Sequence, residues 1–251
     1  MPDDLIKKAI KLVHDSQYVV AFTGAGISVE SGISDFRSPG GLWSRYDPEI
    51  YATWHNFLKS PEKYWTMSRE LTAALLEAKP NAAHLALARL ENLGKLKAII
   101  TQNIDNLHHR AGNSRILELH GNYRTVQCLD CHTRYRRVDI LPRLNAGEIP
   151  PLCTECGGIL RSNAVLFGQP LPQETIKEAT EESLRCDLLM VIGSSLQVYP
   201  AASFPLLAKK NGSNLLIINK EPTFQDRYAD LVIHRLAGAT LQVIVEELER
   251  F

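Results

Sequence analysis

The sequence predicts an α/β fold in which a doubly wound parallel sheet carries two inserted modules. Short apolar runs alternate along most of the 251 residues with stretches of helical periodicity, as expected of a parallel sheet covered by helices. The first apolar run leads into a Gly-x-Gly turn at Gly24 and Gly26. Two regions, 38–80 and 122–161, interrupt the alternation, and we interpret them as insertions into one domain.

The expected strands and helices follow from local patterns. β-branched and aliphatic residues dominate the short apolar runs, and helical spacing marks the segments between them. Asp3 or Asp4 suits the N-cap of the first helix. The expected strands are 18–22, 96–100, 188–192 and 214–218, with a last one at Val232 and Ile233. The expected helices are 4–14, 61–77, 81–93, 173–185, 201–209 and 240–250.

The domain boundaries follow from the same pattern. A chain of this length suits one large domain with insertions. The sheet domain, Rossmann-like in its order of elements, is expected over 1–37, 81–121 and 162–251. Residues 38–80 form a helical insertion and 122–161 a polar, cysteine-bearing one.

Composition excludes several classes of protein. The formal net charge is zero and charged residues make up 22%, whereas a nucleic-acid binder normally shows a basic excess. No apolar run approaches the roughly 20 residues of a membrane span. The N-terminal segment has two acids and a helical period, so it resembles neither a signal nor a transit peptide. We therefore expect a cytoplasmic protein.

The cysteine pattern is the most specific local signal. Cys128 and Cys131 form one CxxC pair, and Cys153 and Cys156 form another 21 residues later. This spacing predicts a four-thiolate zinc site, which is closed and therefore structural. The alternatives are two incidental pairs or a redox dithiol. Cys186, in an apolar stretch, is expected to be a buried free thiol.

Polar groups follow several of the expected strands. The Gly-x-Gly turn lacks the third glycine of a dinucleotide-binding loop, since Val29 stands there. Backbone amides at a helix start still favour a diphosphate. Gly193 begins a Gly-Ser-Ser turn, and Asn219, with Glu221 two residues later, follows another strand. Because parallel strands end at one edge of a sheet, these groups predict a dinucleotide site there.

A further strand end carries groups suited to catalysis. Gln102, Asn103 and Asp105 directly follow the strand at 96–100 and could bind an amide and a ribose. His120 lies between a strand-like run and a glycine. A histidine beside a nucleotide crevice is a candidate general base.

The motifs GAGIS, GISDFR, TQNID, HG, two CxxC pairs and GSS, in this order, resemble those of the sirtuins. Sirtuins are the Sir2 family of NAD-dependent protein-lysine deacylases. The resemblance covers nearly the whole chain. In this respect the chain is similar to the compact bacterial and archaeal members of the family. It implies an acyl-lysine protein substrate, NAD consumed as a co-substrate, release of nicotinamide, and no membrane or nucleic-acid partner.

The resemblance also assigns roles to individual residues. His120 matches the general base, and Asn103 is the second catalytic residue. Asp105 matches the group that binds the nicotinamide carboxamide. Asp35, Phe36 and Arg37 match the flap over the nicotinamide ribose. The remaining matches to NAD contacts are Gly24, Ala25, Gly26, Val29, Ile33, Gln102, Ile104, Ser194, Ser195, Lys220 and Ala237, beside Gly193, Asn219 and Glu221 above.

The family's chemistry is a transfer of the acyl group to the ADP-ribose part of NAD. The acyl oxygen attacks the anomeric carbon, nicotinamide leaves, and a ribose hydroxyl deprotonated through His120 attacks the linked amide. The products are free lysine, nicotinamide and O-acetyl-ADP-ribose. The peptide is expected as an added strand between two segments, formed by Val165, Leu166, Phe167 and Gly168 and by Val198 and Tyr199.

The chain departs from the common family pattern at a few positions. Ser34 and Ser162 stand where many members have proline, and Gln169 replaces an acid. Ser68 and Leu71 occupy the positions where members that prefer succinyl- or malonyl-lysine carry tyrosine and arginine. A buried acidic group without a cation is costly, so acetyl or longer apolar chains are favoured, unless neighbouring Arg69 takes that place.

Two other functions remain open on the sequence alone. A mono-ADP-ribosyltransferase would use the same NAD site on a different nucleophile. A non-catalytic NAD- and zinc-binding interaction module would not need His120. A zinc-ribbon nucleic-acid binder is disfavoured, since Arg134, Arg136 and Arg137 form only a short basic run, interpreted as a solvated face.

Overall fold

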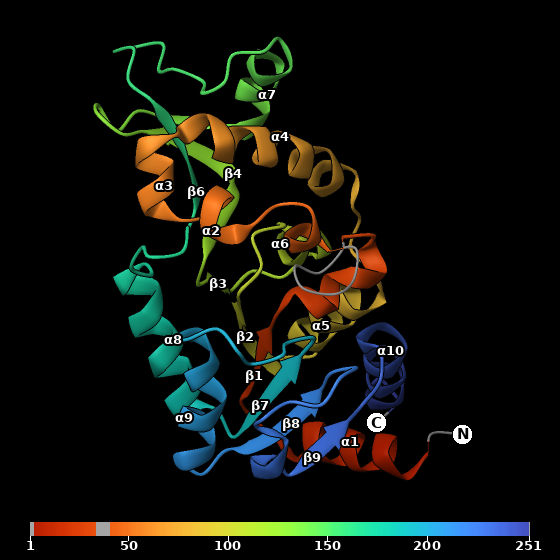
Figure 1. Cartoon of the computed structure of the whole chain (residues 1–251). Helices are drawn as coiled ribbons and strands as arrows, with labels where there is room; N and C mark the ends of the chain where they lie inside the picture. Colours follow the sequence, from red (N-terminus) through yellow and green to blue (C-terminus); the bar gives the residue numbers. More distant parts are fainter. Residues whose placement is uncertain (1–2, 34–40, 251) are drawn as a thin grey trace.

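A six-stranded parallel sheet forms the larger of two lobes (Figure 1). A computed structural model describes residues 3–33 and 41–250. The strand order is β3-β2-β1-β7-β8-β9, which reverses direction between β1 and β7, as in dinucleotide-binding sheets. The strands are β1 (Val19–Thr23), β2 (Leu96–Thr101), β3 (Ile116–Glu118), β7 (Leu188–Ile192), β8 (Asn214–Ile218) and β9 (Leu231–Ile233).

Helices cover both faces of this sheet. Successive residues of β1 point to opposite faces: Val19 and Ala21 belong to one apolar cluster, and Val20 and Phe22 to another. The first cluster packs under α1, α5 and α10, and the second under α8 and α9 (Figure 1). The bounds are α1 (Asp4–Asp15), α5 (Ala82–Asn92), α8 (Gln173–Arg185), α9 (Phe204–Lys210) and α10 (Ala237–Leu248).

The smaller lobe combines both expected insertions around one apolar core. Leu42, Phe57 and Trp65 from the first insertion pack with Val126 and Leu160 from the second. An antiparallel sheet of order β5-β4-β6 lies beside α2, α3, α4 and α7. The bounds are α2 (Pro48–Tyr51), α3 (Trp54–Lys59), α4 (Pro61–Glu77), β4 (Gly121–Cys128), β5 (Arg134–Arg136), α7 (Arg137–Asn145) and β6 (Leu160–Ala164).

Short elements connect the two lobes and the strand ends. The 3-10 helix η1 (Ala25–Ser31) follows β1, and α6 (Leu107–Ala111) follows β2. The remaining 3-10 helices are η2 (Leu42–Ser44), η3 (Ala201–Ser203) and η4 (Asp226–Tyr228). No helix in the described ranges is long and apolar enough to cross a membrane.

The predicted α/β class and its inserted cysteine-bearing module are confirmed. Asp3 is the N-cap of α1, and its side chain accepts from the Leu5 and Ile6 amides. β6 pairs with β4 through Ala164, so residues 162–164 belong to the small sheet by pairing. The exact domain boundaries remain a prediction.

Candidate active site at the carboxyl edge of the sheet

The turns after β1 and β7 meet where the strand order reverses. The Gly26 amide donates to the Gly193 carbonyl at 2.8 Å. A Cβ on Gly193 would lie 2.2 Å from the Ile27 nitrogen, and its φ is +61°. A Cβ on Gly24 would lie 2.8 Å from the Gly193 carbonyl oxygen. These glycines therefore allow two backbones to touch, and the Gly26 amide is not free to bind a phosphate.

Behind this contact, Asn103, Ser28 and Asp105 form a buried hydrogen-bond network. The Asn103 side-chain amide donates to the Gly24 carbonyl at 3.1 Å and to the Ser28 hydroxyl at 3.2 Å. Ser28 in turn donates to the Asp105 carboxylate at 2.7 Å. Three residues predicted for the NAD site, Gly24, Asn103 and Asp105, are thus brought together from the ends of β1 and β2.

Burial raises the pKa of Asp105, although the Leu107 amide and the Ser28 hydroxyl both donate to it and lower the pKa in part. Asp105 as a whole is 7% exposed. A buried acceptor of this kind suits recognition of an uncharged donor such as a carboxamide.

His120 and Ser194 join the same edge through Gln102. The Gln102 side-chain amide donates to the Ser194 hydroxyl at 2.9 Å. The ring nitrogen Nδ1 of His120 lies 2.9 Å from the Gln102 carbonyl. Because a carbonyl can only accept, Nδ1 carries the proton, and Nε2 of the neutral ring is left as an acceptor.

Burial lowers the pKa of His120, and the hydrogen bond to Gln102 offsets this only in part. The ring is therefore neutral at neutral pH. A neutral imidazole with a fixed tautomer and a free Nε2 is equipped to accept a proton.

The predicted adenosine end lies at the carboxyl end of β8 and the start of α10. The Asn219 side chain donates to the Glu221 carbonyl at 2.6 Å. Lys220 and Glu221 are exposed, and Nζ of Lys220 lies 3.8 Å from Oε1 of Glu221. Ala237 is buried. Within the described ranges, no hydrogen bond or ion pair joins these residues to the Asn103 network.

Other predicted NAD contacts lie along η1 and the strand ends. Val29 is 41% exposed, and the Ile33 amide donates to the Ser28 carbonyl at 3.3 Å. Ile104 accepts from the Tyr123 amide at 3.3 Å, and Ser195 is exposed. Ala25 is half-buried at the start of η1. Ser34, Asp35, Phe36 and Arg37 lie outside the described residues.

The predicted peptide segment lies against the His120 strand end. The Val165 amide donates to the His120 carbonyl at 2.8 Å. The Phe167 amide donates to the Ala52 carbonyl, and the Phe167 carbonyl accepts from the Trp54 amide. The Leu166 amide donates to the Gln169 side chain. The Gln169 found in place of an acid thus holds this segment. Tyr199, in the second predicted segment, is 66% exposed, and the Val198 carbonyl accepts from Ala202.

A cluster of buried polar side chains lies next to Asn103 and was not predicted from the sequence. The Asn103 amide donates to the Thr101 hydroxyl, which lies 2.8 Å from Thr23. The Thr23 hydroxyl lies 2.9 Å from Nε2 of His108, whose ring centroid is 4.9 Å from that of His84, with the two rings tilted by 57°. Thr23 and Thr101 sit within apolar strands, where nothing in the sequence marks them as partners of histidines distant in the chain.

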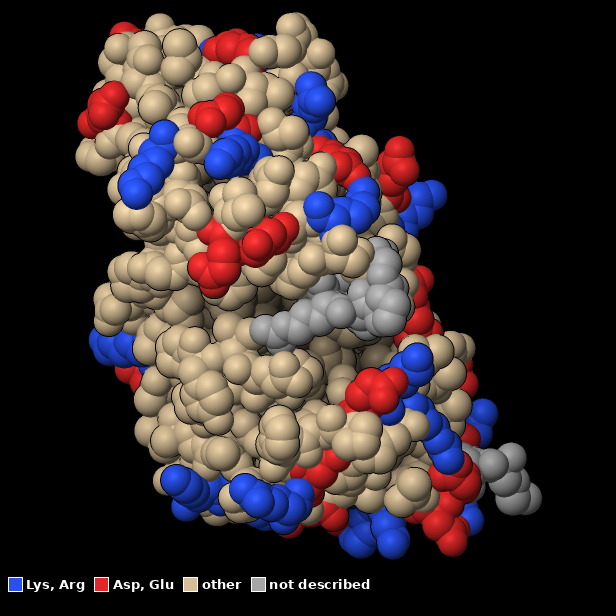
Figure 2. Space-filling view, viewed as in Figure 1, with Lys and Arg blue, Asp and Glu red and all other residues tan. Residues whose placement is uncertain are grey.

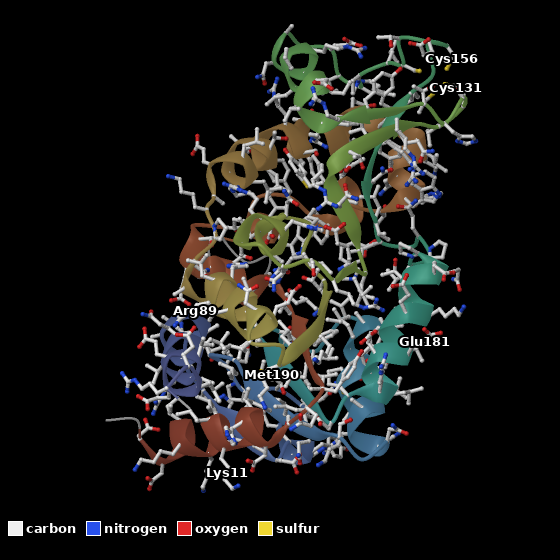
Figure 3. All side chains as sticks on the ribbon, turned by 180° about the vertical axis from the view of Figure 1, so that it is seen from behind. Lys11, Arg89, Cys131, Cys156, Glu181 and Met190 are labelled. Carbon is white, nitrogen blue, oxygen red and sulfur yellow. The ribbon has the colours of Figure 1, made fainter. Side chains whose placement is uncertain are left out.

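The four predicted zinc ligands converge at the far end of the small lobe (Figure 3). Their sulfurs all lie within 4.8 Å of one another, and two pairs are 3.5 Å apart. Zinc–sulfur bonds of about 2.3 Å place tetrahedral sulfurs roughly 3.8 Å apart. The cluster therefore fits a structural zinc ion. Tyr135 lies 3.0 Å from the Cys153 sulfur and can donate to a thiolate.

One expectation about the basic run is wrong. Arg134 and Arg136 are exposed, but Arg137 is 1% exposed. Its guanidinium lies 4.9 Å from the centroid of the Trp65 ring and 4.4 Å from that of Tyr123. The charge pattern of the sequence could not distinguish this residue from its solvated neighbours.

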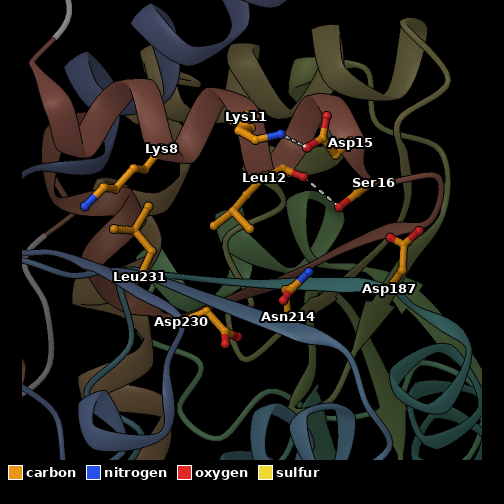
Figure 4. Close-up of a pocket in the computed structure, with 9 residues that line it drawn as sticks. All are labelled: Lys8, Lys11, Leu12, Asp15, Ser16, Asp187, Asn214, Asp230 and Leu231. Carbon is orange, nitrogen blue, oxygen red and sulfur yellow. Dashed lines mark hydrogen bonds and ion pairs between the residues drawn. The ribbon is translucent and has the colours of Figure 1, made fainter.

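The described residues on the face of the molecule in Figure 2 carry both basic and acidic side chains, which are interspersed. A hollow of about 380 Å³ lies between α1 and the amino ends of β7, β8 and β9 (Figure 4). Its acids are already engaged: Asp15 pairs with Lys11, and Asp187 accepts from the Gln17 and Tyr18 amides.

Comparisons with known proteins agree on one family. A model described as "Sir2 family" matches residues 24–200. The chain is 49% identical to "NAD-dependent protein deacylase 2" of Archaeoglobus fulgidus, covering 99% of this chain and 98% of that protein.

Solved structures give the same result. One described as "Structural Basis for the Mechanism and Regulation of Sir2 Enzymes" is 48% identical, covers 99% of both chains and has a TM-score of 0.92. A Sir2 variant solved with a deacetylated p53 peptide and 3′-O-acetyl ADP-ribose is 39% identical, covers 96% of this chain and 98% of that one, and also has a TM-score of 0.92. Matches of this extent to the family model, the curated relative and both structures show that the chain belongs to the Sir2 family.

Proposed function

We propose that this protein is an NAD-dependent protein-lysine deacetylase or deacylase. It transfers the acyl group of N6-acyl-lysine to the ADP-ribose of NAD, giving nicotinamide, deacylated lysine and O-acetyl-ADP-ribose. The observation that carries the proposal is the fixed tautomer of His120, whose Nδ1 donates to the Gln102 carbonyl at 2.9 Å beside the Asn103 network. Membership of the Sir2 family supports it.

In this proposal NAD binds across the strand ends. Asp105 accepts from the nicotinamide carboxamide, and Ser28 and Asn103 hold that carboxylate in place. Gln102 and Ser194, already joined by a hydrogen bond, contact the ribose region. The adenosine end is held by residues after β8, after β7 and at the start of α10: Asn219, Lys220, Glu221, Ser195 and Ala237.

The chemical step begins when the acyl oxygen attacks the anomeric carbon of the nicotinamide ribose. Nicotinamide leaves as a neutral molecule, because the bond that breaks carries its electron pair to a cationic ring. Nε2 of His120 then accepts the proton of a ribose hydroxyl, which attacks the linked amide carbon. The bond between this carbon and the lysine nitrogen then breaks, the amine leaves with a proton, and water adds to the cyclic acyl group to give O-acetyl-ADP-ribose. The contribution of one positioned general base is about 10²- to 10⁴-fold.

The acyl-lysine peptide pairs with Val165–Gly168 and with Val198–Tyr199. Val165 is half-buried and Gly168 is exposed, and main-chain hydrogen bonds demand little of the peptide's sequence. The four cysteines hold a zinc ion that stabilises the lobe and takes no part in the reaction. Because none of the five cysteines forms a disulfide, the protein suits a reducing, cytoplasmic location.

Mass spectrometry of an acetyl-lysine peptide incubated with NAD tests the proposal, with His120→Ala alongside. Loss of one acetyl group with matching O-acetyl-ADP-ribose, in the unsubstituted protein alone, is the expected result. A peptide that stays unchanged in its acetyl form and in a longer apolar acyl form would overturn it. If the protein or a target then gained the mass of ADP-ribose, a mono-ADP-ribosyltransferase would take its place. If NAD also stayed intact, a binding module would.

A further inference from the structure

A partly buried ion pair lies at the carboxyl end of β3. The Arg124 side chain, from β4, forms two hydrogen bonds with the Glu118 carboxylate: Nη1 donates to Oε1 at 2.7 Å and Nη2 to Oε2 at 2.8 Å. The side chain of Glu118 is 15% exposed and that of Arg124 is 35% exposed. A two-point pair of this kind fixes the orientation of the guanidinium, which a single hydrogen bond does not do.

The same guanidinium reaches the loop that carries Asn103 and Asp105. Nη1 of Arg124 also donates to Oδ1 of Asn106, at 2.7 Å. Asn106 directly follows Asp105 and has a φ of +67°, in the left-handed region. Asparagine tolerates this region better than most residues, but less well than glycine. The hydrogen bond to Arg124 therefore stabilises a backbone conformation that the loop does not favour by itself.

Arg124 is the cation that balances Glu118. A charged His109 would share this role, because its Nε2 lies 3.4 Å from Oε1 of Glu118. Partial burial lowers the pKa of His109, the charge of Arg124 lowers it further, and Glu118 offsets this only in part. The ring is therefore neutral at neutral pH. Among the residues that the structure describes, the charge of Glu118 is then matched by Arg124 alone.

Two strand ends of the proposed active site are joined through this one side chain. Glu118 lies two residues before His120, and Asn106 lies one residue after Asp105. The pair with Glu118 anchors Arg124 to β3, and the bond to Asn106 extends that anchor to the loop after β2. The position of Asp105 relative to the His120 strand end therefore depends on Arg124.

Asp105 is held by anchors on both sides of it in the chain. Before it, the Ile104 carbonyl accepts from the Tyr123 amide at 3.3 Å. After it, Asn106 accepts from Arg124. Both donors are neighbours in β4, so the loop is bound to one rigid strand at two points. Only the second anchor is a side-chain contact, which a substitution can remove without changing the backbone.

We propose that Arg124 is a positioning residue that determines how tightly nicotinamide is held at Asp105. The inference rests on the proposed deacylase function, in which Asp105 accepts from the nicotinamide carboxamide. Without Arg124 the loop is less constrained, and binding of NAD and of the product nicotinamide weakens. The rate of proton transfer is retained, because His120 is held separately by its bond to the Gln102 carbonyl.

Steady-state kinetics with an acetyl-lysine peptide tests the proposal. The measured quantities are kcat, KM for NAD and the inhibition constant of added nicotinamide. Arg124→Met keeps the apolar stem and removes every N–H donor. We expect it to raise both constants by about threefold to tenfold, since one partly exposed hydrogen bond is lost, and to change kcat by less than about twofold.

Variants of Asn106 separate the hydrogen bond from the charge. Asn106→Gly removes the acceptor but adopts the positive φ without strain, so we expect a rise similar to that in Arg124→Met. Asn106→Asp retains an acceptor oxygen, and both constants should stay near those of the unsubstituted protein. The double variant of Arg124→Met and Asn106→Gly should be no worse than either alone, because both remove the same contact.

Arg115→Met is the matched control. Arg115 directly precedes β3 and donates to the buried Glu182 carboxylate at 2.7 Å, at the opposite end of that strand from Glu118. This variant removes the same charge and a comparable ion pair. It should lower the free energy of unfolding to a similar extent and leave KM for NAD and the nicotinamide constant unchanged.

Several results would overturn the role of Arg124 and leave the deacylase intact. They are equal rises in Arg115→Met and Arg124→Met, unchanged constants in Asn106→Gly, or a fall in kcat with both constants unchanged. If Arg124→Met does not fold, the two Asn106 variants decide the question.

Removal of no acyl group by the unsubstituted protein would overturn the deacylase itself. Calorimetric titration of NAD into the same variants would then decide the role of Arg124, because it needs no turnover. The same order of affinities would support that role, and equal affinities would overturn it.

Discussion

The Ser28 hydroxyl donates to the Asp105 carboxylate at 2.7 Å, across 77 residues of sequence. Ser28 lies in η1 after β1, and Asp105 lies in the loop after β2. The same hydroxyl accepts from the Asn103 side chain at 3.2 Å. One hydroxyl therefore fixes both side chains that are proposed to face nicotinamide.

Removing this hydroxyl should weaken NAD binding more than it slows the chemistry. A hydrogen bond to a charged group contributes about 1.5 kcal/mol or more, so Ser28→Ala raises KM for NAD by roughly tenfold. Steady-state kinetics at saturating peptide checks this. Ser31→Ala, in the same 3-10 helix but bonded to Asn81, serves as the control. A fall in kcat with KM unchanged would contradict the assigned role.

The activity should stay level as pH falls from 8 to the ordinary range of histidine. The neutral form of His120 is the base, and burial lowers the pKa of His120 below 6.5. The acid limb of kcat/KM therefore lies below pH 6.5, since only there does the ring gain a proton and stop accepting one. A profile measured from pH 4.5 to 8 tests this. A midpoint at or above 6.5 would mean that another group controls the limb.

The fold was largely predictable from the sequence because its signals are local. Each strand of the large sheet except β3 is a short apolar run close to its expected range. The small lobe was less predictable. Leu42 and Leu160 belong to one apolar core although they are distant in sequence. Two regions that the sequence predicted as separate insertions therefore pack together in one lobe.

The candidate site was predictable only where a strand end marked it. Gly24, Asn103 and His120 stand at such ends, and the structure brings them to one edge. His108 and Arg137 carry no comparable signal. Their importance depends on which groups tertiary packing places around them, and a charged residue in a polar stretch is normally exposed.

Because Gly193 lies so close to η1, we expect that adding a single methyl group there strongly lowers the free energy of unfolding. Gly193→Ala would place Cβ 2.2 Å from the Ile27 nitrogen at a φ of +61°. Gly94 has a similar φ of +70° but open space around it. We expect Gly94→Ala to lower the free energy of unfolding by about 1 kcal/mol and Gly193→Ala by about 3 kcal/mol or more. Urea unfolding compares them, and equal losses would mean that strain alone requires glycine.

Removal of zinc should disrupt the small lobe. The free energy of binding structural zinc is about 10–16 kcal/mol in small domains, and Cys128 and Cys153 share an apolar cluster with Trp65. We expect one zinc per chain by elemental analysis, and a chelator should change tryptophan fluorescence as it removes the metal. Cys128→Ser loses zinc, whereas Cys186→Ser retains it. Zinc-free protein with unchanged fluorescence and Tm would contradict a structural role.

Two buried histidines should make the protein less stable in mild acid. Burial lowers the pKa of His84 to about 4, and it lowers the pKa of His108 well below 6.5. Each ring is neutral in the folded protein, whereas the unfolded chain binds a proton from about pH 6.5 downward. The stability is therefore fully present above pH 6.5 and falls as pH drops toward 4, by up to about 1.4 kcal/mol per pH unit for each histidine.

Urea unfolding at pH 7 and at pH 5 measures this loss, and variants assign it. His84→Gln removes one titrating group from the buried pair, so its stability should fall less steeply between the two pH values than that of the unsubstituted protein. The exposed His55 provides the control, since His55→Gln should keep the full slope. Other acids contribute equally to all three proteins and cancel in the comparison. Identical slopes in all three would mean that His84 already takes up a proton in the folded state, through a water or a movement that opens the His84–His108 contact.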